Sequence, residues 1–175
     1  MIPFHFPGRF RWLVFLLGGF LLMASPACMK KENYPVVPEI SYQGFTLEYD
    51  SGMYATRGFL TFSFKDGDGD IGLSENMIQP PYDTGSIYYY NLFIDYYEKQ
   101  DGRFVKVDLN PTLNARLPYL TPDDPNKSIS GFISDTLPLN PMPVHDTIMV
   151  KFRICDRALH LSNTDSTPVI ILKKR

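Results

Sequence analysis

GFLTFSFKDGDGDIG (residues 58–72) contains an apolar-alternating segment followed directly by an acidic loop. In the first half, Leu60, Phe62 and Phe64 alternate with polar residues, which is the period-two pattern of a strand with one buried face. In the second half, Gly67 and Gly69 give the backbone the freedom to curl the loop and turn its aspartate side chains inward. This stretch therefore predicts a β-fold.

The rest of the chain repeats the strand pattern. Six further segments alternate or are rich in β-forming residues: 43–50, 87–99, 104–107, 128–134, 148–155 and 168–173. Asp101-Gly102 predicts a tight hairpin turn between two of them. No segment keeps a helical period for three turns. We predict an all-β domain of about seven antiparallel strands, an immunoglobulin-like or fibronectin-like β-sandwich, with a small barrel as the alternative.

The acidic loop is a candidate metal site. Asp66, Asp68 and Asp70 place three carboxylates within five residues, and their mutual repulsion is relieved only by a cation or by open water. Calcium fits best, because it is a hard ion that takes six to eight oxygen ligands. The loop is not an EF-hand, since Ile71 replaces the glycine at position six and Met77 the glutamate at position twelve.

A β-sandwich loop can draw further ligands from a neighbouring loop. In an immunoglobulin-type topology the loop after the second strand and the loop before the last strand emerge at the same end. We therefore predict that Asp156, which follows the 148–155 strand, joins Asp66, Asp68 and Asp70 in one metal site. Glu75 is also near enough in sequence to be considered. The alternative is a solvated acidic turn that holds no ion.

The first residues have the layout of a secretory leader. Arg9 and Arg11 precede an apolar run, and small residues lead up to Cys28. The uncharged run from residue 12 to 27 has sixteen residues, which is shorter than the roughly 20 of a membrane-spanning helix. Small residues before a cysteine are similar to the lipobox of bacterial lipoproteins. This resemblance implies that residues 1–27 are removed and that Cys28 is acylated, for example with palmitate; ordinary secretion with a free Cys28 is the alternative.

Residues 28–41 are polar and proline-containing, so we expect a flexible tether, with the folded domain spanning residues 42–175. Without the leader, which contributes only two of the charged residues, the chain has 15 basic and 19 acidic residues and a net charge of −4. Basic residues are not clustered enough to bind nucleic acid, because Lys173-Lys174-Arg175 is only a short tail.

Aromatic residues are crowded between positions 82 and 97. If residues 87–99 form one strand, Tyr88 and Tyr90 lie on the core face, and Tyr89, Phe93 and Tyr97 lie on the opposite face. Such an aromatic row with polar neighbours is a possible ligand face for sugar rings or a protein partner. The alternative is that a loop of the same chain, for example residues 110–127, covers it.

The sequence shows no catalytic arrangement. His145 and His160 have no nucleophile in the context of a triad. Cys155 has outward parity at the end of its strand, but no adjacent group lowers its pKa clearly, so an inert thiol is the stronger interpretation. We therefore expect a protein that is not an enzyme.

Asp156-Arg157-Ala158-Leu159-His160-Leu161-Ser162-Asn163 resembles the Asp-x-Ala-Gly-Asn-x-Ser turn near the end of many bacterial immunoglobulin-like modules. With the DGDGDIG loop and the leader, the chain looks like small Bacteroidota-type surface lipoproteins that have a single immunoglobulin-like domain and no established activity. The resemblance implies a lipid anchor in the outer membrane or at the cell surface, facing the periplasm or the exterior. We expect a calcium-stabilised binding or assembly module for an unidentified protein or glycan, with a carbohydrate-binding accessory lipoprotein as the alternative.

Overall fold

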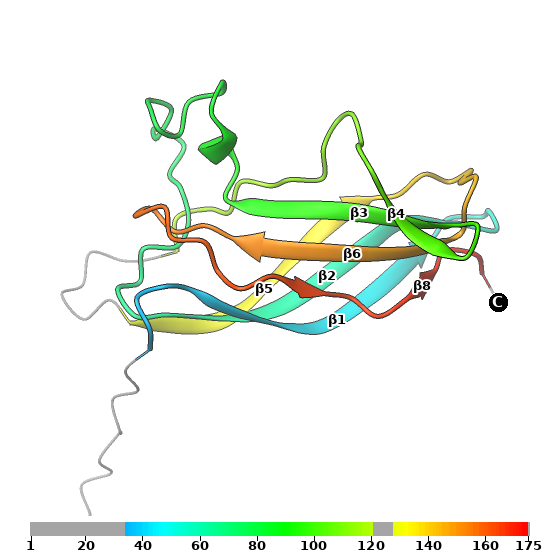
Figure 1. Cartoon of the computed structure of the whole chain (residues 1–175), viewed down its shortest axis with the longest axis horizontal. Helices are drawn as coiled ribbons and strands as arrows, with labels where there is room; N and C mark the ends of the chain where they lie inside the picture. Colours follow the sequence, from blue (N-terminus) through cyan, green and yellow to red (C-terminus); the bar gives the residue numbers. More distant parts are fainter. Residues whose placement is uncertain (1–33, 121–127, 175) are drawn as a thin grey trace, which may run out of the picture. The chain divides into compact units, whose positions relative to one another are not determined.

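The computed structural model describes residues 34–120 and 128–174. In this part of the chain two antiparallel sheets pack face to face as a β-sandwich (Figure 1), which confirms the predicted fold class. The leader (1–27), Cys28 and residues 29–33 of the expected tether lie outside the described residues. Their assignments therefore stay predictions.

One sheet has three strands in the order β1-β2-β5, and the other has the order β4-β3-β6-β7, with β8 also paired to β6. Their bounds are Glu39–Tyr49 (β1), Ala55–Asp66 (β2), Leu92–Gln100 (β3), Arg103–Val107 (β4), Ile129–Pro138 (β5), Thr147–Ile154 (β6), Asp165–Ser166 (β7) and Ile170–Ile171 (β8). Since β7 and β8 both pair with β6, they act as two pieces of one last strand. The sandwich therefore has about seven strands, as predicted.

The core lies between the two sheets and consists of the inward residues of each strand. Leu60 and Phe62 of β2 face Val150 and Phe152 of β6, and all four side chains are buried. The Phe62 and Phe152 rings lie 5.2 Å apart in a tilted arrangement. Burial of such side chains contributes about 1.5–3 kcal/mol each, so the alternation seen in the sequence is what fixes the two sheets against each other.

The strand predicted from residue 87 to 99 begins only at Leu92. Residues Ile87–Tyr89 form a 3₁₀ turn (η1), because the Ser86 hydroxyl accepts a hydrogen bond from the Tyr88 amide at 3.0 Å and offers the backbone a local alternative to the sheet. Tyr88 and Tyr90 are half-buried and lie outside the buried core, so the predicted core position of both rings is wrong.

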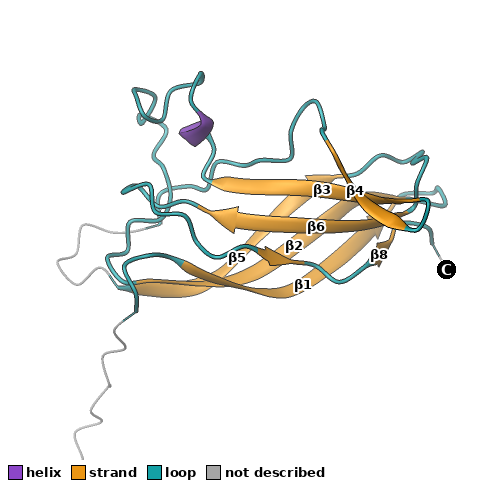
Figure 2. Ribbon diagram, in the orientation of Figure 1, coloured by secondary structure: helices purple, strands orange, loops and turns teal. Residues whose placement is uncertain are grey.

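Two other boundaries can be compared with the predictions. Strand β1 begins at Glu39, three residues before the expected start of the domain at Tyr42. The β3–β4 hairpin has the predicted turn, with Asp101 and Gly102 both at positive φ (49° and 82°). The long loop between β2 and β3 and the turn after β6 gather at the end of the sandwich where β2 and β6 finish (Figure 2).

Candidate metal centre

Two loops meet at this end of the sandwich. Asp66 is the last residue of β2, and Asp156 follows the end of β6 by two residues. Because β2 and β6 belong to opposite sheets and finish at the same end, the segments that leave them run side by side. Ile71 and Asp156 form an isolated antiparallel bridge between the two segments. The Arg157 amide donates to the Asp70 carbonyl at 3.2 Å, which extends this contact.

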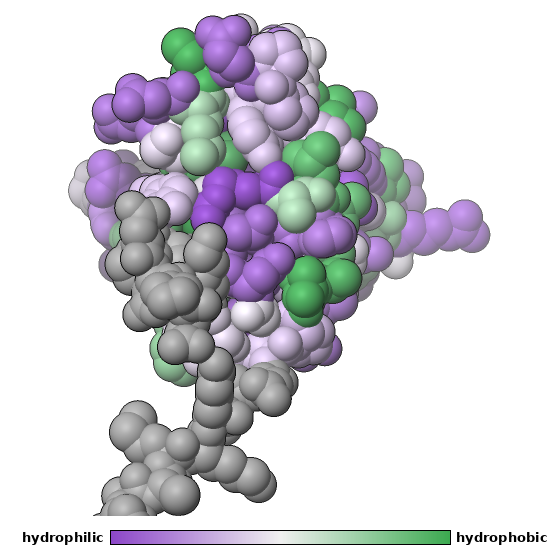
Figure 3. Space-filling model, turned by 90° about the vertical axis from the view of Figure 1, so that its left-hand side faces the viewer, coloured by the Kyte–Doolittle hydropathy of each residue, from purple (hydrophilic) through white to green (hydrophobic). Residues whose placement is uncertain are grey.

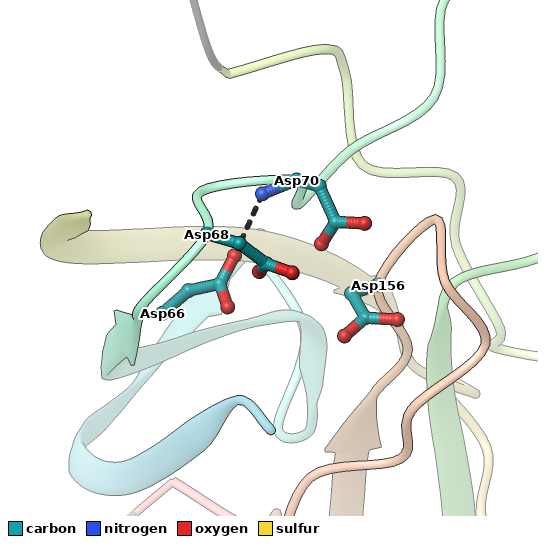
Figure 4. Close-up of side chains that lie close together, drawn as sticks. All are labelled: Asp66, Asp68, Asp70 and Asp156. Atoms are coloured by element: carbon teal, nitrogen blue, oxygen red, sulfur yellow. Dashed lines mark hydrogen bonds between the residues drawn. The ribbon is translucent and has the colours of Figure 1, made fainter. Parts of the chain in front are cut away.

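The four aspartates lie together, as the sequence predicted. Each of Asp66, Asp68, Asp70 and Asp156 offers a carboxylate oxygen, and these four oxygens all lie within 4.8 Å of one another. Figure 4 shows the four side chains converging on one space: Asp66 comes from the end of β2, Asp68 and Asp70 from the loop after it, and Asp156 from the segment after β6. Asp66 is 0% exposed and Asp156 is 2% exposed, so the cluster reaches into the protein and is not a solvated surface turn.

The backbone satisfies one oxygen of Asp66 and one of Asp70. Asp66 Oδ2 accepts from the Asp70 amide at 2.8 Å, which curls the loop, and Asp70 Oδ2 accepts from the Ala158 amide at 3.0 Å, which joins the loops. The other oxygen of each of the three, Oδ1 of Asp66, Asp68 and Asp70, is buried and has no hydrogen-bond partner. Buried polar atoms are nearly always paired. Three orphaned acceptors in one cluster therefore point to a missing electropositive group.

The electrostatics agree with this geometry. Burial, followed by the charge of Asp68, raises the pKa of Asp66 to about 7. Burial and the charges of Asp156 and Asp68 raise the pKa of Asp70, although Arg157 partly opposes this shift. Both carboxyls are harder to ionise than ordinary aspartates because four negative groups share one poorly hydrated space. A bound cation removes that penalty.

Asp156 is held by the turn that follows it. Its Oδ1 accepts from the His160 amide at 2.7 Å, and its Oδ2 lies 2.9 Å from His160 Nδ1. Leu159 makes this turn with a φ of 67°, a left-handed conformation that glycine usually supplies. The turn thus adopts the conformation expected from its resemblance to an Ala-Gly-Asn turn, although a leucine stands at the glycine position.

Arg157 is a functional residue of the site that the sequence analysis missed. Its Nη1 donates to the carbonyls of Ile71 and Gly72, at 3.2 and 3.0 Å, and its guanidinium stacks 4.3 Å from the Tyr119 ring. The Tyr82 hydroxyl donates to the Arg157 carbonyl. Arg157 thus ties the loops together beside the carboxylates. The only feature of the sequence that could have indicated a role for Arg157 is its position next to Asp156. No sequence pattern predicts the direction in which its side chain points.

Glu75, the other acid considered from the sequence, is exposed and does not belong to the four-carboxylate group. Cys155 was expected on the outward face, but it is 2% exposed, because the turn after β6 folds back and pairs Leu161 with it. Burial, together with Asp156 and Asp70, raises the pKa of its thiol to about 12. The thiol therefore stays protonated at neutral pH, and a thiolate role is disfavoured.

The aromatic row expected from the sequence is not continuous. Tyr89 belongs to η1, so it does not share a strand face with Phe93 and Tyr97. A cation lies over each ring: Arg116 over Tyr89 at 5.2 Å, Arg153 over Phe93 at 5.6 Å and Lys151 over Tyr97 at 5.1 Å. Since these rings are already stacked by side chains of the same chain, they offer little free face to a sugar.

The site end of the domain has a hydrophilic centre with hydrophobic residues at its margins (Figure 3). Four carboxylates, two of them buried and two half-buried, form an all-oxygen donor set that could hold a metal ion, and such a set suits a hard cation. The fold and the site thus define an all-β sandwich with an acidic cluster shared by two loops.

No family model, curated protein or solved structure matches this chain. Within the described ranges, no helix is both long and apolar enough to cross a membrane. The function of the protein is therefore inferred from the residues of the site.

Proposed function

We propose that the four-aspartate cluster binds one calcium ion and that the protein is a non-catalytic, calcium-stabilised binding or assembly module. The observation that carries this proposal is the set of three buried carboxylate oxygens that have no hydrogen-bond partner, in a cluster whose four residues each offer an oxygen within 4.8 Å of the others. Leaving such acceptors unpaired costs about 1–3 kcal/mol each, and more when they are charged. A cation that binds all of them converts this cost into a stabilising interaction.

The size of the cluster favours calcium over magnesium. Calcium binds oxygen at 2.3–2.6 Å, so ligands on opposite sides of the ion are about 4.6–5.2 Å apart, whereas the corresponding span around magnesium is about 4.0–4.2 Å. The four ligand oxygens lie within 4.8 Å of one another, and this limit falls within the calcium span and above the magnesium span. Water or the second oxygens of the carboxylates would complete the coordination.

The loops and the leader suggest the setting in which the module works. Calcium is abundant outside cells, and the leader with its lipobox-like cysteine supports export and anchoring through Cys28 at the outer membrane or cell surface. In this proposal the protein contacts the membrane through its lipid anchor and acts on an unidentified protein or glycan.

Anchoring has its own test. In a Cys28→Ala variant the leader is expected to be poorly processed, and the exported protein is expected to partition into the aqueous phase of a detergent extraction. Wild-type protein should enter the detergent phase. Detergent-phase behaviour that does not change in the variant would contradict lipidation at Cys28.

Calcium binding is tested by thermal unfolding with calcium and with a chelator. Binding to the folded state alone stabilises it by about 2.7 kcal/mol at a hundredfold excess over the Kd. For a chain of this size that corresponds to a rise in Tm of roughly 5–10 °C. The response should be lost when Asp68→Asn and Asp70→Asn are combined, because these changes remove two of the four charges.

The matched control is Glu75→Gln, which removes a nearby acid that lies outside the cluster. This variant should respond to calcium like wild type. A Tm that changes with neither calcium nor chelator, or a double variant that responds to calcium like wild type, would contradict calcium binding and show that the loop is only an acidic turn.

A further inference from the structure

The segment through which the chain enters the sandwich is packed against the acidic loop. The Gly67 amide, between the first two cluster aspartates, donates to the Pro35 carbonyl at 2.7 Å. The Tyr34 hydroxyl lies 3.2 Å from Ser130 Oγ on β5, and Lys65 Nζ lies 5.4 Å from the centre of the Tyr34 ring. Pro35 is thus held by the acidic loop, and Tyr34 is held beside it by β5 and by Lys65 of β2.

Gly67 is required for this contact because there is no space for a side chain. A Cβ at this position would lie 2.7 Å from the Pro35 carbonyl oxygen and would also overlap the Tyr34 carbonyl. Contacts under 3.0 Å to backbone atoms are not tolerated, so an alanine would force the segment and the loop apart. The two backbones are in direct contact only while the loop keeps its curled conformation.

The segment that supplies the fourth carboxylate continues into residues that hold the start of β1. Asn163 donates from Nδ2 to the Ile40 carbonyl at 3.0 Å and accepts from the Ile40 amide at 2.8 Å. Asp165 Oδ2 accepts from the Tyr42 amide at 2.6 Å. Residues 39–42 belong to β1 and are paired with β2, so these side-chain contacts add to the strand pairing. Residues 34–38 precede the strand, and their backbone partner is the acidic loop.

We infer that calcium binding at the four-aspartate cluster locks residues 34–38 onto the end of the sandwich, so that the ion controls how the chain enters β1. This inference rests on the proposed calcium site. The ion pulls the 66–70 loop and Asp156 together, which sets the Gly67 amide against Pro35. Without the ion, repulsion among the carboxylates loosens the loop, and the entry segment loses its partner.

This coupling gives the ion a role beyond stability. Residues 34–38 precede β1 in the sequence, so a locked segment fixes the direction in which the chain enters the sandwich.

Hydrogen exchange followed by mass spectrometry on the full chain in detergent tests the inference, with calcium chloride or a chelator as the two conditions. At a hundredfold excess of calcium over the Kd, the Gly67 amide, which donates to the Pro35 carbonyl, should exchange about a hundredfold more slowly than in chelator. Equal exchange of this amide in both conditions, while calorimetry shows calcium binding, would overturn the lock and leave the calcium site intact.

Gly67→Ala separates the lock from the ion site. All four aspartates remain, so calorimetry should still show calcium binding, but the amide at position 67 should exchange quickly with and without calcium because its Pro35 partner is displaced. Gly44→Ala is the matched control, because a Cβ there has no heavy atom within 4 Å and the calcium-dependent protection should persist. Full protection in Gly67→Ala would also overturn the inference, and a complete lack of calcium binding by wild type would remove the proposed function together with it.

Discussion

Single residues with an unusual backbone conformation determine how the loops of the site are placed. Gly72 has a φ of 93°, and a Cβ there would overlap the Pro118 carbonyl, so only glycine lets the acidic loop pass beneath residues 117–120. Leu159 adopts a similar left-handed conformation with a side chain, at a cost of about 1–2 kcal/mol. Backbone strain of this kind is found where a turn must hold a particular side chain in position, and this turn holds Asp156.

One buried residue away from the cluster gives a pH prediction. Tyr96 of β3 is 6% exposed, and burial together with the charge of Glu98 raises the pKa of its hydroxyl to about 12 from 10.0. A raised folded-state pKa means that the folded state keeps its proton longer than the unfolded state. The stability from neutral Tyr96 is therefore fully present below pH 10 and is lost as the pH rises from 10 to 12.

In a Tyr96→Phe variant this loss is absent. Between pH 10 and 12 the free energy of unfolding of wild type should fall by about 2–3 kcal/mol more than that of the variant. Denaturant titrations of both proteins at several alkaline pH values measure the difference. Parallel pH profiles for the two proteins would show that Tyr96 ionises equally easily in the folded and unfolded states.

Among the elements, those with a strict local pattern were predictable. Strands β2 and β6 follow from alternation, because one side of each packs into the core and the other does not. The β3–β4 turn follows from Asp101-Gly102, whose left-handed conformation is local chemistry. The Asp66–Asp156 pairing was predictable as well, since it requires only the sheet assignment of two strands and the direction in which each runs.

Other elements depended on contacts that no sequence pattern records. The start of β3 was placed too early because Tyr88 and Tyr90 continue the alternation, and the Ser86 hydroxyl bond that breaks it is a single local interaction. The alternation of residues 148–155 predicts that Cys155 lies on the outer face of its strand. The turn after β6 covers that face, so Cys155 is buried. The early start of β1 depends on the side chain of Asn163, which lies 123 positions from Ile40.

For the whole molecule, the acidic cluster joins parts that are distant in the sequence. It brings together the ends of β2 and β6, one from each sheet, at the end of the sandwich where residues 34–38 enter. A cation there acts as a cross-link between the two sheets in the folded state only, which is the reason for expecting both a gain in stability and a locked entry segment.

The central claim is that four carboxylates from two loops bind one calcium ion, and calorimetric titration of the full chain with calcium tests it most directly. The account predicts one calcium ion per chain, and an Asp156→Asn variant whose affinity is at least about tenfold weaker, because it loses a charged ligand. Glu75→Gln should bind like wild type. Absence of calcium binding by wild type at millimolar concentrations, or wild-type affinity in Asp156→Asn, would contradict the account.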